Sequence, residues 1–210
     1  NNNVKPTEPI AEPVEIKEYY ISHLFFDANV DILTPQNNKK LDQLANLLLI
    51  YPKIKAELSC FELPTGQKTF NLYFSIKKTE KAAEYLAGKG IPRSRLLLKG
   101  YGSSFPLVAK PVSNNISPLY QKLNQRLEIA LHDYESEPVI IDIESIKVPE
   151  NLQDPKGVKF STLSNQLFYS VQIASISQIL QNQAIESVEE LFIEVENSSG
   201  NYLYMAGMLP

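Results

Sequence analysis

Cysteine and histidine are both scarce in this sequence of 210 residues, which has one cysteine and two histidines. The single thiol, Cys60, excludes an internal disulfide and a cysteine-rich zinc site, and it is compatible with either redox compartment. His23 and His132 fall in separate predicted strands with no cysteine nearby, so we interpret them as core or surface side chains rather than metal ligands. We therefore expect neither a metal nor a cofactor.

Positive charge and long apolar runs are also in short supply. The 20 Lys and Arg are outnumbered by 24 Asp and Glu, and the net charge of −4 argues against a nucleic-acid partner, which would need a basic surface. No run of 18 apolar residues occurs, so no transmembrane segment is predicted. The sequence also lacks a nucleophile elbow and a phosphate-binding glycine loop, and paired acids such as Glu189 and Glu190 lie in segments expected to be exposed. We predict that the chain is not an enzyme.

The length and overall composition of the chain are those of a folded protein with one large or two small domains. Apolar residues make up 43% of the chain and charged residues 21%, which is enough for a buried core. Residues 1–17 carry three prolines among acids, a composition typical of an extended tether. The sequence begins with Asn1 and has no leader-like segment, so we expect a processed product or a piece of a longer protein.

Residues 18–133 alternate strand-like and helix-like segments. One helix is predicted from Thr34, an N-cap followed by proline, to about Tyr51, because leucines recur at helical spacing. A second helix is predicted after Asn71 and ends near Gly88. Strand-like segments surround the two helices at 18–29, 54–61, 95–99 and 126–131. This alternation implies βαβ units and a partly parallel sheet.

A connector over residues 134–165 leads to a second predicted unit at 166–210. That unit begins with the strand LFYSVQIAS and continues with a polar helix near 176–184. Two more strands, ELFIEVEN and NYLYMAG, are joined by turn residues. A βαββ unit of about 45 residues is near the lower size limit of a stable domain, so we expect it to be truncated.

Several blocks of the first unit resemble the OmpA-like peptidoglycan-associated domain. The blocks are HLFFDANVDILTPQNNKKLDQLANLL, IYPKIKAELS, NLYFSIKK with AAEYLAGKGIPRSRLLLKGYGSSFP, and NQRLEI, in the family's order over about residues 18–133. The resemblance implies an α+β fold, with a βαβαβ-type mixed sheet and helices on one face. It also implies a periplasmic, outer-membrane-associated location. Family members hold the cell-wall stem peptide, with an aspartate on the ammonium of diaminopimelate and an arginine on its carboxylate.

An ungapped carry-over places the family's peptidoglycan site on partly substituted residues. The aspartate falls on Leu63 and the arginine on Lys78, whereas the helix-opening asparagine is kept as Asn71 and the closing block keeps Arg126. Leucine accepts no hydrogen bond from an ammonium, and lysine lacks the planar two-pronged geometry of arginine. Glu62 takes the acid's place only if the loop shifts register. The hypothesis is a degenerate site, with weak anion binding still open at the N-terminus of the second helix.

The second unit resembles, more weakly, the first part of an SPOR domain, a βαββαβ fold that binds glycan strands. Gln172 falls on a glutamine of the family's strand, and an outward polar residue on an alternating strand explains it equally well. The connector is similar to one that joins OmpA-like and SPOR-like parts in outer-membrane proteins of Bacteroidota. The unit would then be a partial βαββ SPOR-like domain.

Two functions compete. The first is a non-enzymatic module of an outer-membrane-associated envelope complex, such as a type IX secretion or gliding assembly. It would dock other outer-membrane or periplasmic proteins and bind peptidoglycan weakly or not at all, as Leu63 and Lys78 suggest. The alternative is a functional non-covalent anchor that tethers the outer membrane to the cell wall, as the resemblance over the whole domain suggests.

Overall fold

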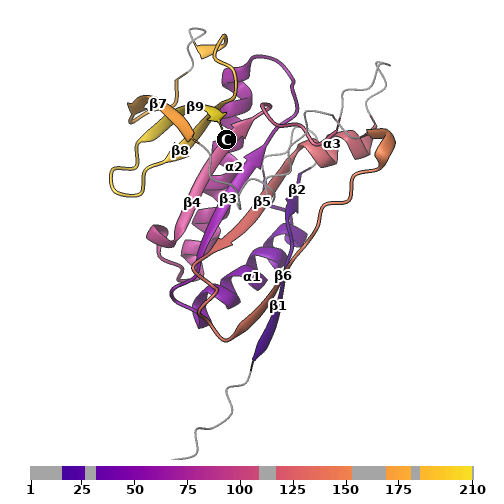
Figure 1. Cartoon of the computed structure of the whole chain (residues 1–210), viewed down its shortest axis with the longest axis vertical. Coiled ribbons are helices and arrows are strands. Elements are labelled where there is room, and N and C mark those ends of the chain that lie inside the picture. The colour runs from indigo at the N-terminus through magenta and orange to yellow at the C-terminus, as the bar shows by residue number, and fades with distance from the viewer. Residues whose placement is uncertain (1–15, 27–31, 109–116, 153–168, 181–184, 210) are drawn as a thin grey trace, which may run out of the picture.

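The computed structural model describes residues 16–26, 32–108, 117–152, 169–180 and 185–209 (Figure 1). Its helices are α1 (Pro35–Ile50), α2 (Lys68–Gly88) and α3 (Pro118–Asn124), with short 3-10 turns at Arg93–Arg95 and Glu150–Leu152. Its strands are β1 (Lys17–Ile21), β2 (Leu24–Phe25), β3 (Lys55–Phe61), β4 (Leu96–Gly102), β5 (Arg126–His132), β6 (Val139–Ile143), β7 (Tyr169–Ile176), β8 (Leu191–Val195) and β9 (Tyr202–Leu209). The fold is α+β with a mixed sheet, as predicted.

Seven strands form the main sheet in the order β2-β5-β3-β4-β8-β9-β7. β3 pairs parallel with β4 and antiparallel with β5, so the centre of the sheet has the predicted mixed character. β1 and β6 form a separate parallel pair beside α1 (Figure 1). No helix in the described ranges combines the length and apolar character needed to cross a membrane.

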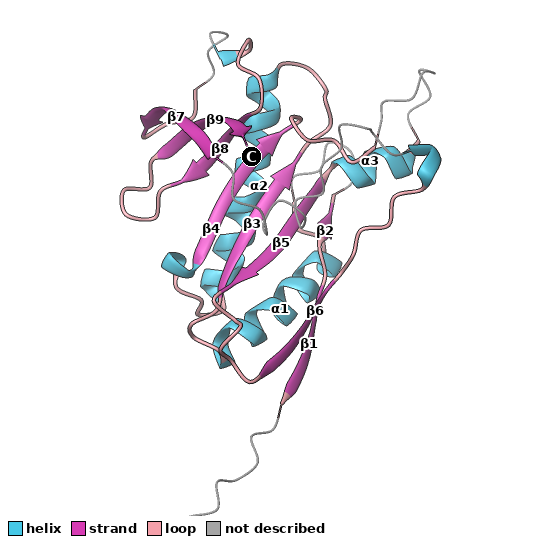
Figure 2. Ribbon diagram, viewed as in Figure 1, coloured by secondary structure: helices cyan, strands magenta, loops and turns pink. Residues whose placement is uncertain are grey.

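The main core lies between the sheet and the two long helices (Figure 2). Alternate strand residues such as Leu58, Leu98 and Ile129 face this core together with apolar residues of α1 and α2. The start of α1 follows the predicted chemistry, because Thr34 Oγ1 accepts a hydrogen bond from the backbone N–H of Asn37 at 3.2 Å.

Helix α2 lies unusually close to β4. A Cβ atom added at Gly100 would come within 2.7 Å of Ser75 Oγ and 2.8 Å of the backbone nitrogen of Ile76. Ser75 Oγ also accepts a hydrogen bond from the backbone N–H of Gly102 at 3.0 Å. The first half of α2 is therefore held against the ends of β3 and β4, where the predicted site lies.

The second predicted unit continues the first sheet. β8 pairs antiparallel with β4, with Lys99 opposite Glu194, and β9 and β7 follow outward to the edge (Figure 1). The helix predicted near 176–184 is wrong where the structure describes it, since β7 runs to Ile176 and residues 177–180 are not helical. Residues 181–184 lie outside the described part of the chain. The domain boundaries stay a prediction.

Candidate ligand-binding site

Glu62 and Lys78, two of the predicted site residues, form a buried ion pair. Glu62 Oε1 lies 2.6 Å from Lys78 Nζ, and the side chains are 6% and 3% exposed. The other carboxylate oxygen, Oε2, accepts a hydrogen bond from Gln125 Nε2 at 3.2 Å. The ammonium also lies 4.7 Å from the centroid of the Phe26 ring. Both charges are therefore compensated within the protein.

The structure corrects the ungapped placement that put Leu63 opposite Lys78. The backbone N–H of Glu62 still donates to the carbonyl of Gly102, at 2.7 Å, so strand geometry extends one residue past β3. Side chains alternate along a strand, so Cys60 and Glu62 point to the helix side, and Leu63 points away. Leu63 packs instead in an apolar cluster with Leu107, Val108, Tyr120, Leu123 and Ile146. The residue opposite the lysine is thus an acid.

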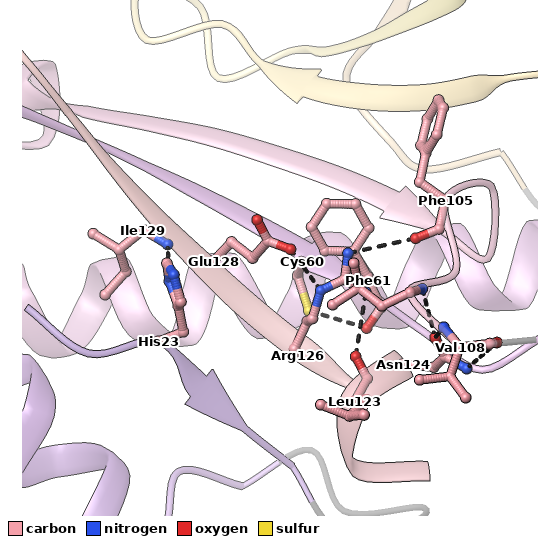
Figure 3. Close-up of polar contacts among 11 residues, drawn as sticks. His23, Cys60, Phe61, Phe105, Val108, Leu123, Asn124, Arg126, Glu128 and Ile129 are labelled. Atoms are coloured by element: carbon pink, nitrogen blue, oxygen red, sulfur yellow. Dashed lines mark hydrogen bonds and ion pairs between the residues drawn. The ribbon is translucent and has the colours of Figure 1, made fainter. Parts of the chain in front are cut away.

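Arg126 lies on the face of the sheet opposite to the Glu62–Lys78 pair. Figure 3 shows its partners on that face. Its guanidinium is fully buried, donates from Nε to Glu128 Oε1 at 2.6 Å, and stacks 3.8 Å from the Phe61 ring centroid. Nη1 and Nη2 donate to the carbonyls of Leu123 and Phe105, each at 3.4 Å. Burial lowers the pKa of this arginine. These contacts make Arg126 a structural residue.

The two remaining predicted residues also lie apart from the pair. Asn71 is buried near the start of α2, and its Nδ2 donates to Ser103 Oγ at 3.1 Å. Gln172 is exposed on the edge strand β7, opposite Met205 of β9. Of the six residues predicted for a site, the structure brings together only Glu62 and Lys78.

The N-terminus of α2, where weak anion binding was expected, is occupied by a carboxylate of the chain itself. Glu186 Oε2 accepts from the backbone N–H of Lys68 at 2.8 Å, and Oε1 accepts from the N–H and hydroxyl of Thr69 at 3.0 and 2.8 Å. Lys68 Nζ in turn donates to the carbonyls of Glu186 and Val188 at 2.9 and 2.6 Å. Hydrogen bonds from Thr69 are the main cause that lowers the pKa of Glu186.

Glu186 lies 117 residues from Thr69 in the chain, so no local pattern around α2 predicts it as the acceptor. The start of α2 gives only an indirect indication that a distant acceptor is needed. The N-cap of α2 is Gln67, which makes no side-chain capping hydrogen bond, so the first N–H groups of the helix needed another acceptor.

A polar cavity of about 170 Å³ lies beside Phe26, the ring that contacts Lys78. Phe25 and Phe26 form one side, Thr34, Gln36, Asn37 and Lys40 come from the start of α1, and Lys122 comes from α3. None of the residues predicted for the site lines this cavity. Within the described ranges, no three His, Cys, Asp or Glu side chains gather in a way that could hold a metal ion.

No family model matches the chain, but sequence similarity to known envelope proteins is clear. The chain is 31% identical over 139 residues to outer membrane protein A of Yersinia pseudotuberculosis, covering 62% of this chain and 39% of that protein. It is 23% identical over 123 residues to outer membrane porin F of Pseudomonas fluorescens, covering 59% and 35%. It is 24% identical over 100 residues to the peptidoglycan-binding protein ArfA of Mycobacterium tuberculosis, covering 48% and 29%. The chain spans less than half of the length of each of these relatives.

Solved structures of low sequence identity are similar to part of the chain. The peptidoglycan-associated lipoprotein from Burkholderia pseudomallei matches 52% of this chain and 89% of its own, with a TM-score of 0.44 and 19% identity. The C-terminal domain of Helicobacter pylori MotB matches 56% of this chain and 88% of its own, with a TM-score of 0.46 and 18% identity. The sequence relatives support the resemblance to the OmpA-like domain.

Proposed function

We propose that this chain is a non-enzymatic, periplasmic OmpA-like module of an outer-membrane-associated envelope complex. In this proposal, the position that would hold a diaminopimelate head group is closed by the chain's own ion pair. The supporting observation is the 2.6 Å contact between Glu62 and Lys78, with both side chains almost fully buried.

A zwitterionic head group needs an acid and a base that are both free to meet it. Here the acid and the base meet each other, and Gln125 and Phe26 complete their surroundings. Removing one partner from a buried ion pair costs about 3–5 kcal/mol. A ligand that separated the pair without replacing both contacts would lose roughly two to four orders of magnitude in affinity. Weak or absent binding of the stem peptide at this position follows.

The proposal also covers the C-terminal strands and the protein partners of the chain. We infer that residues 166–210 are related to an SPOR domain, which the antiparallel arrangement of β7, β8 and β9 supports. The partners would be other outer-membrane or periplasmic proteins, for example in a type IX secretion or gliding assembly. Tyr169, Val171 and Ile173 are 45–65% exposed on edge strand β7, and such an apolar edge supports a docking role.

Cosedimentation with purified peptidoglycan tests the closed site. The comparison uses the unaltered chain, Lys78→Met, and the control Lys39→Met, which removes an exposed lysine of α1. We expect little binding by the unaltered chain and no difference between the two variants. Circular dichroism would establish that each variant is folded. Saturable binding that Lys78→Met abolishes and Lys39→Met preserves would refute the proposal.

A second candidate function is a working peptidoglycan anchor. It is favoured by the presence of Glu62 opposite Lys78, because an acid and a base remain next to each other at the family's position. If the pair opens toward solvent, the two groups could each bind one charge of the head group. The same cosedimentation decides, since this candidate requires that binding depend on Lys78.

A further inference from the structure

The parallel pair of β1 and β6 has one covered face and one open face. The covered face lies beside α1, where the rings of Tyr19 and Tyr51 meet edge to face with their centroids 6.0 Å apart (Figure 1). Side chains alternate along each strand, so the register of the pair defines the residues of the other face. These residues form the outer face, which consists of Glu18, Tyr20, Ile140 and Asp142.

The outer face presents apolar surface to solvent. Tyr20 is 50% exposed and Ile140 is 52% exposed. Ile16, which continues the same alternation before β1, is 59% exposed. Parallel strands are normally covered on both faces, so an open apolar face on a parallel pair is unusual. The outer face is therefore a candidate for contact with another molecule.

The charges of the outer face are all negative. Glu18 lies opposite Ile140, and Asp142 lies opposite Tyr20, so acidic and apolar side chains alternate both along and across the strands. Neither carboxylate forms an ion pair with another residue that the structure describes. The sequence that precedes β1, residues 1–15, contains three glutamates and one lysine, so it carries no surplus of positive charge for this face.

We propose that the outer face docks a segment of another protein that carries both apolar side chains and lysine or arginine. This inference deepens the proposed docking of envelope proteins and rests on it. The apolar side chains of the segment would cover Tyr20 and Ile140, which removes apolar surface from water. Its cations would meet Glu18 and Asp142, whose fixed positions select the partner and its register.

The same charges disfavour other occupants of the outer face. A second copy of this chain would bring four carboxylates together, two from each copy, and like charges across an interface oppose association. An anionic lipid surface would be repelled for the same reason. A basic protein segment satisfies both the apolar and the acidic positions.

Titrations of the ¹⁵N-labelled chain with synthetic peptides, followed by NMR, test the inference. The three peptides share the sequence acetyl-Ile-X-Tyr-X-Ile-amide, in which X is lysine, glutamine or glutamate. We expect the lysine peptide to shift the amide signals of Tyr20 and Ile140 saturably and the glutamate peptide to leave them unchanged. Glu18→Gln combined with Asp142→Asn should weaken binding of the lysine peptide by about 2- to 30-fold, because two exposed ion pairs are lost.

A matched control separates a defined surface from general charge. Glu84→Gln combined with Glu189→Gln also removes two exposed carboxylates, and it should leave the affinity unchanged. Ile140→Thr keeps a β-branched residue in β6 and should weaken binding through the lost apolar contact. Circular dichroism would establish that each variant is folded.

Each of the opposite results would overturn the inference. No saturable shift at millimolar lysine peptide would remove the docking surface, and equal binding of the glutamine peptide would exclude recognition of charge. Equal weakening in the control variant would reduce the effect to net charge. Shifts of the Tyr20 and Ile140 signals as the concentration of the chain rises would assign the face to a second copy. Their shift in a chain with Lys156→Gln and Lys159→Gln would assign it to the chain's own residues.

The two proposals can fail separately. Cosedimentation with Lys78→Met tests the buried ion pair and peptidoglycan, whereas the peptide titration tests the outer face of β1 and β6. Failure of the titration would leave the closed site in place, and saturable peptidoglycan binding through Lys78 would leave the outer face to be decided by its own result.

Discussion

The Glu62–Lys78 ion pair should behave as a unit whose halves cannot be removed separately. We predict that Lys78→Met and Glu62→Leu each lower the free energy of unfolding by about 3–5 kcal/mol, because each leaves one buried charge without its partner. The double variant replaces both charges by apolar groups beside Phe26. Its main loss is the acceptor of the Gln125 amide, which costs about 1–2 kcal/mol.

A double-mutant cycle measures the coupling energy between Glu62 and Lys78. The coupling energy between the two substitutions should be at least about 3 kcal/mol, measured by urea unfolding followed by circular dichroism. The control is the cycle on Lys55 and Asp133, whose charged atoms are 2.9 Å apart but whose side chains are 48% and 55% exposed. Solvent screening should leave that coupling too small to measure.

Additive effects of the two substitutions would contradict the expected coupling. If each single change costs less than about 1 kcal/mol and the double variant simply adds the two, water reaches the pair. The charges would then be available to a ligand, and the site would be open.

Three further outcomes are expected. Glu186→Ala should lower the free energy of unfolding by about 1 kcal/mol and speed amide hydrogen exchange in the first turn of α2, because it removes the acceptor at that helix start. The hydrogen bond to Glu57 raises the pKa of His132, so protonated His132 stabilises the folded chain. This contribution is complete below pH 6.5 and is lost as pH rises through the raised pKa. In His132→Asn, the free energy of unfolding should therefore change less with pH over this range. Gly100→Ala should cost about 1–3 kcal/mol in urea unfolding, since its Cβ would lie 2.8 Å from the nitrogen of Ile76.

Each of these outcomes has a control or a contradicting result. Gly88→Ala is the control for Gly100→Ala, because a Cβ at Gly88 meets nothing within 4 Å. Unchanged hydrogen exchange in Glu186→Ala would mean that the carboxylate does not cap α2. A pH dependence that survives in His132→Asn would assign the titration to another group.

Much of the fold could be predicted from local patterns. Leucine spacing and the Thr34 cap predict α1, and apolar runs predict β3, β4 and β5, because these signals concern neighbours in the chain. The predicted helix near 176–184 failed in its described part because a short polar segment carries little local preference. The pairing of β8 with β4 joins distant segments, which a local pattern does not specify.

Of the six candidate site residues, only Glu62 and Lys78 come together, and their contact was not expected from the placement on the family. The resemblance identified Glu62 and Lys78 as candidates, yet the ungapped placement assigned the facing position to Leu63. That assignment depended on how far strand pairing extends past Phe61, which a hydrogen bond to Gly102 decides. Because strand side chains alternate, one more paired residue reverses which of two neighbours faces the helix.

Local sequence patterns were sufficient to predict an α+β fold, two long helices and the central strands. The contact between Glu62 and Lys78, the capping of α2 by Glu186, and the shared cavity of Lys40 and Lys122 all depend on how distant segments pack. The two kinds of feature differ in the sequence distance over which they are set. Helix and strand signals act over a few residues, whereas the partner of a buried charge is set by whichever distant segment packs against it.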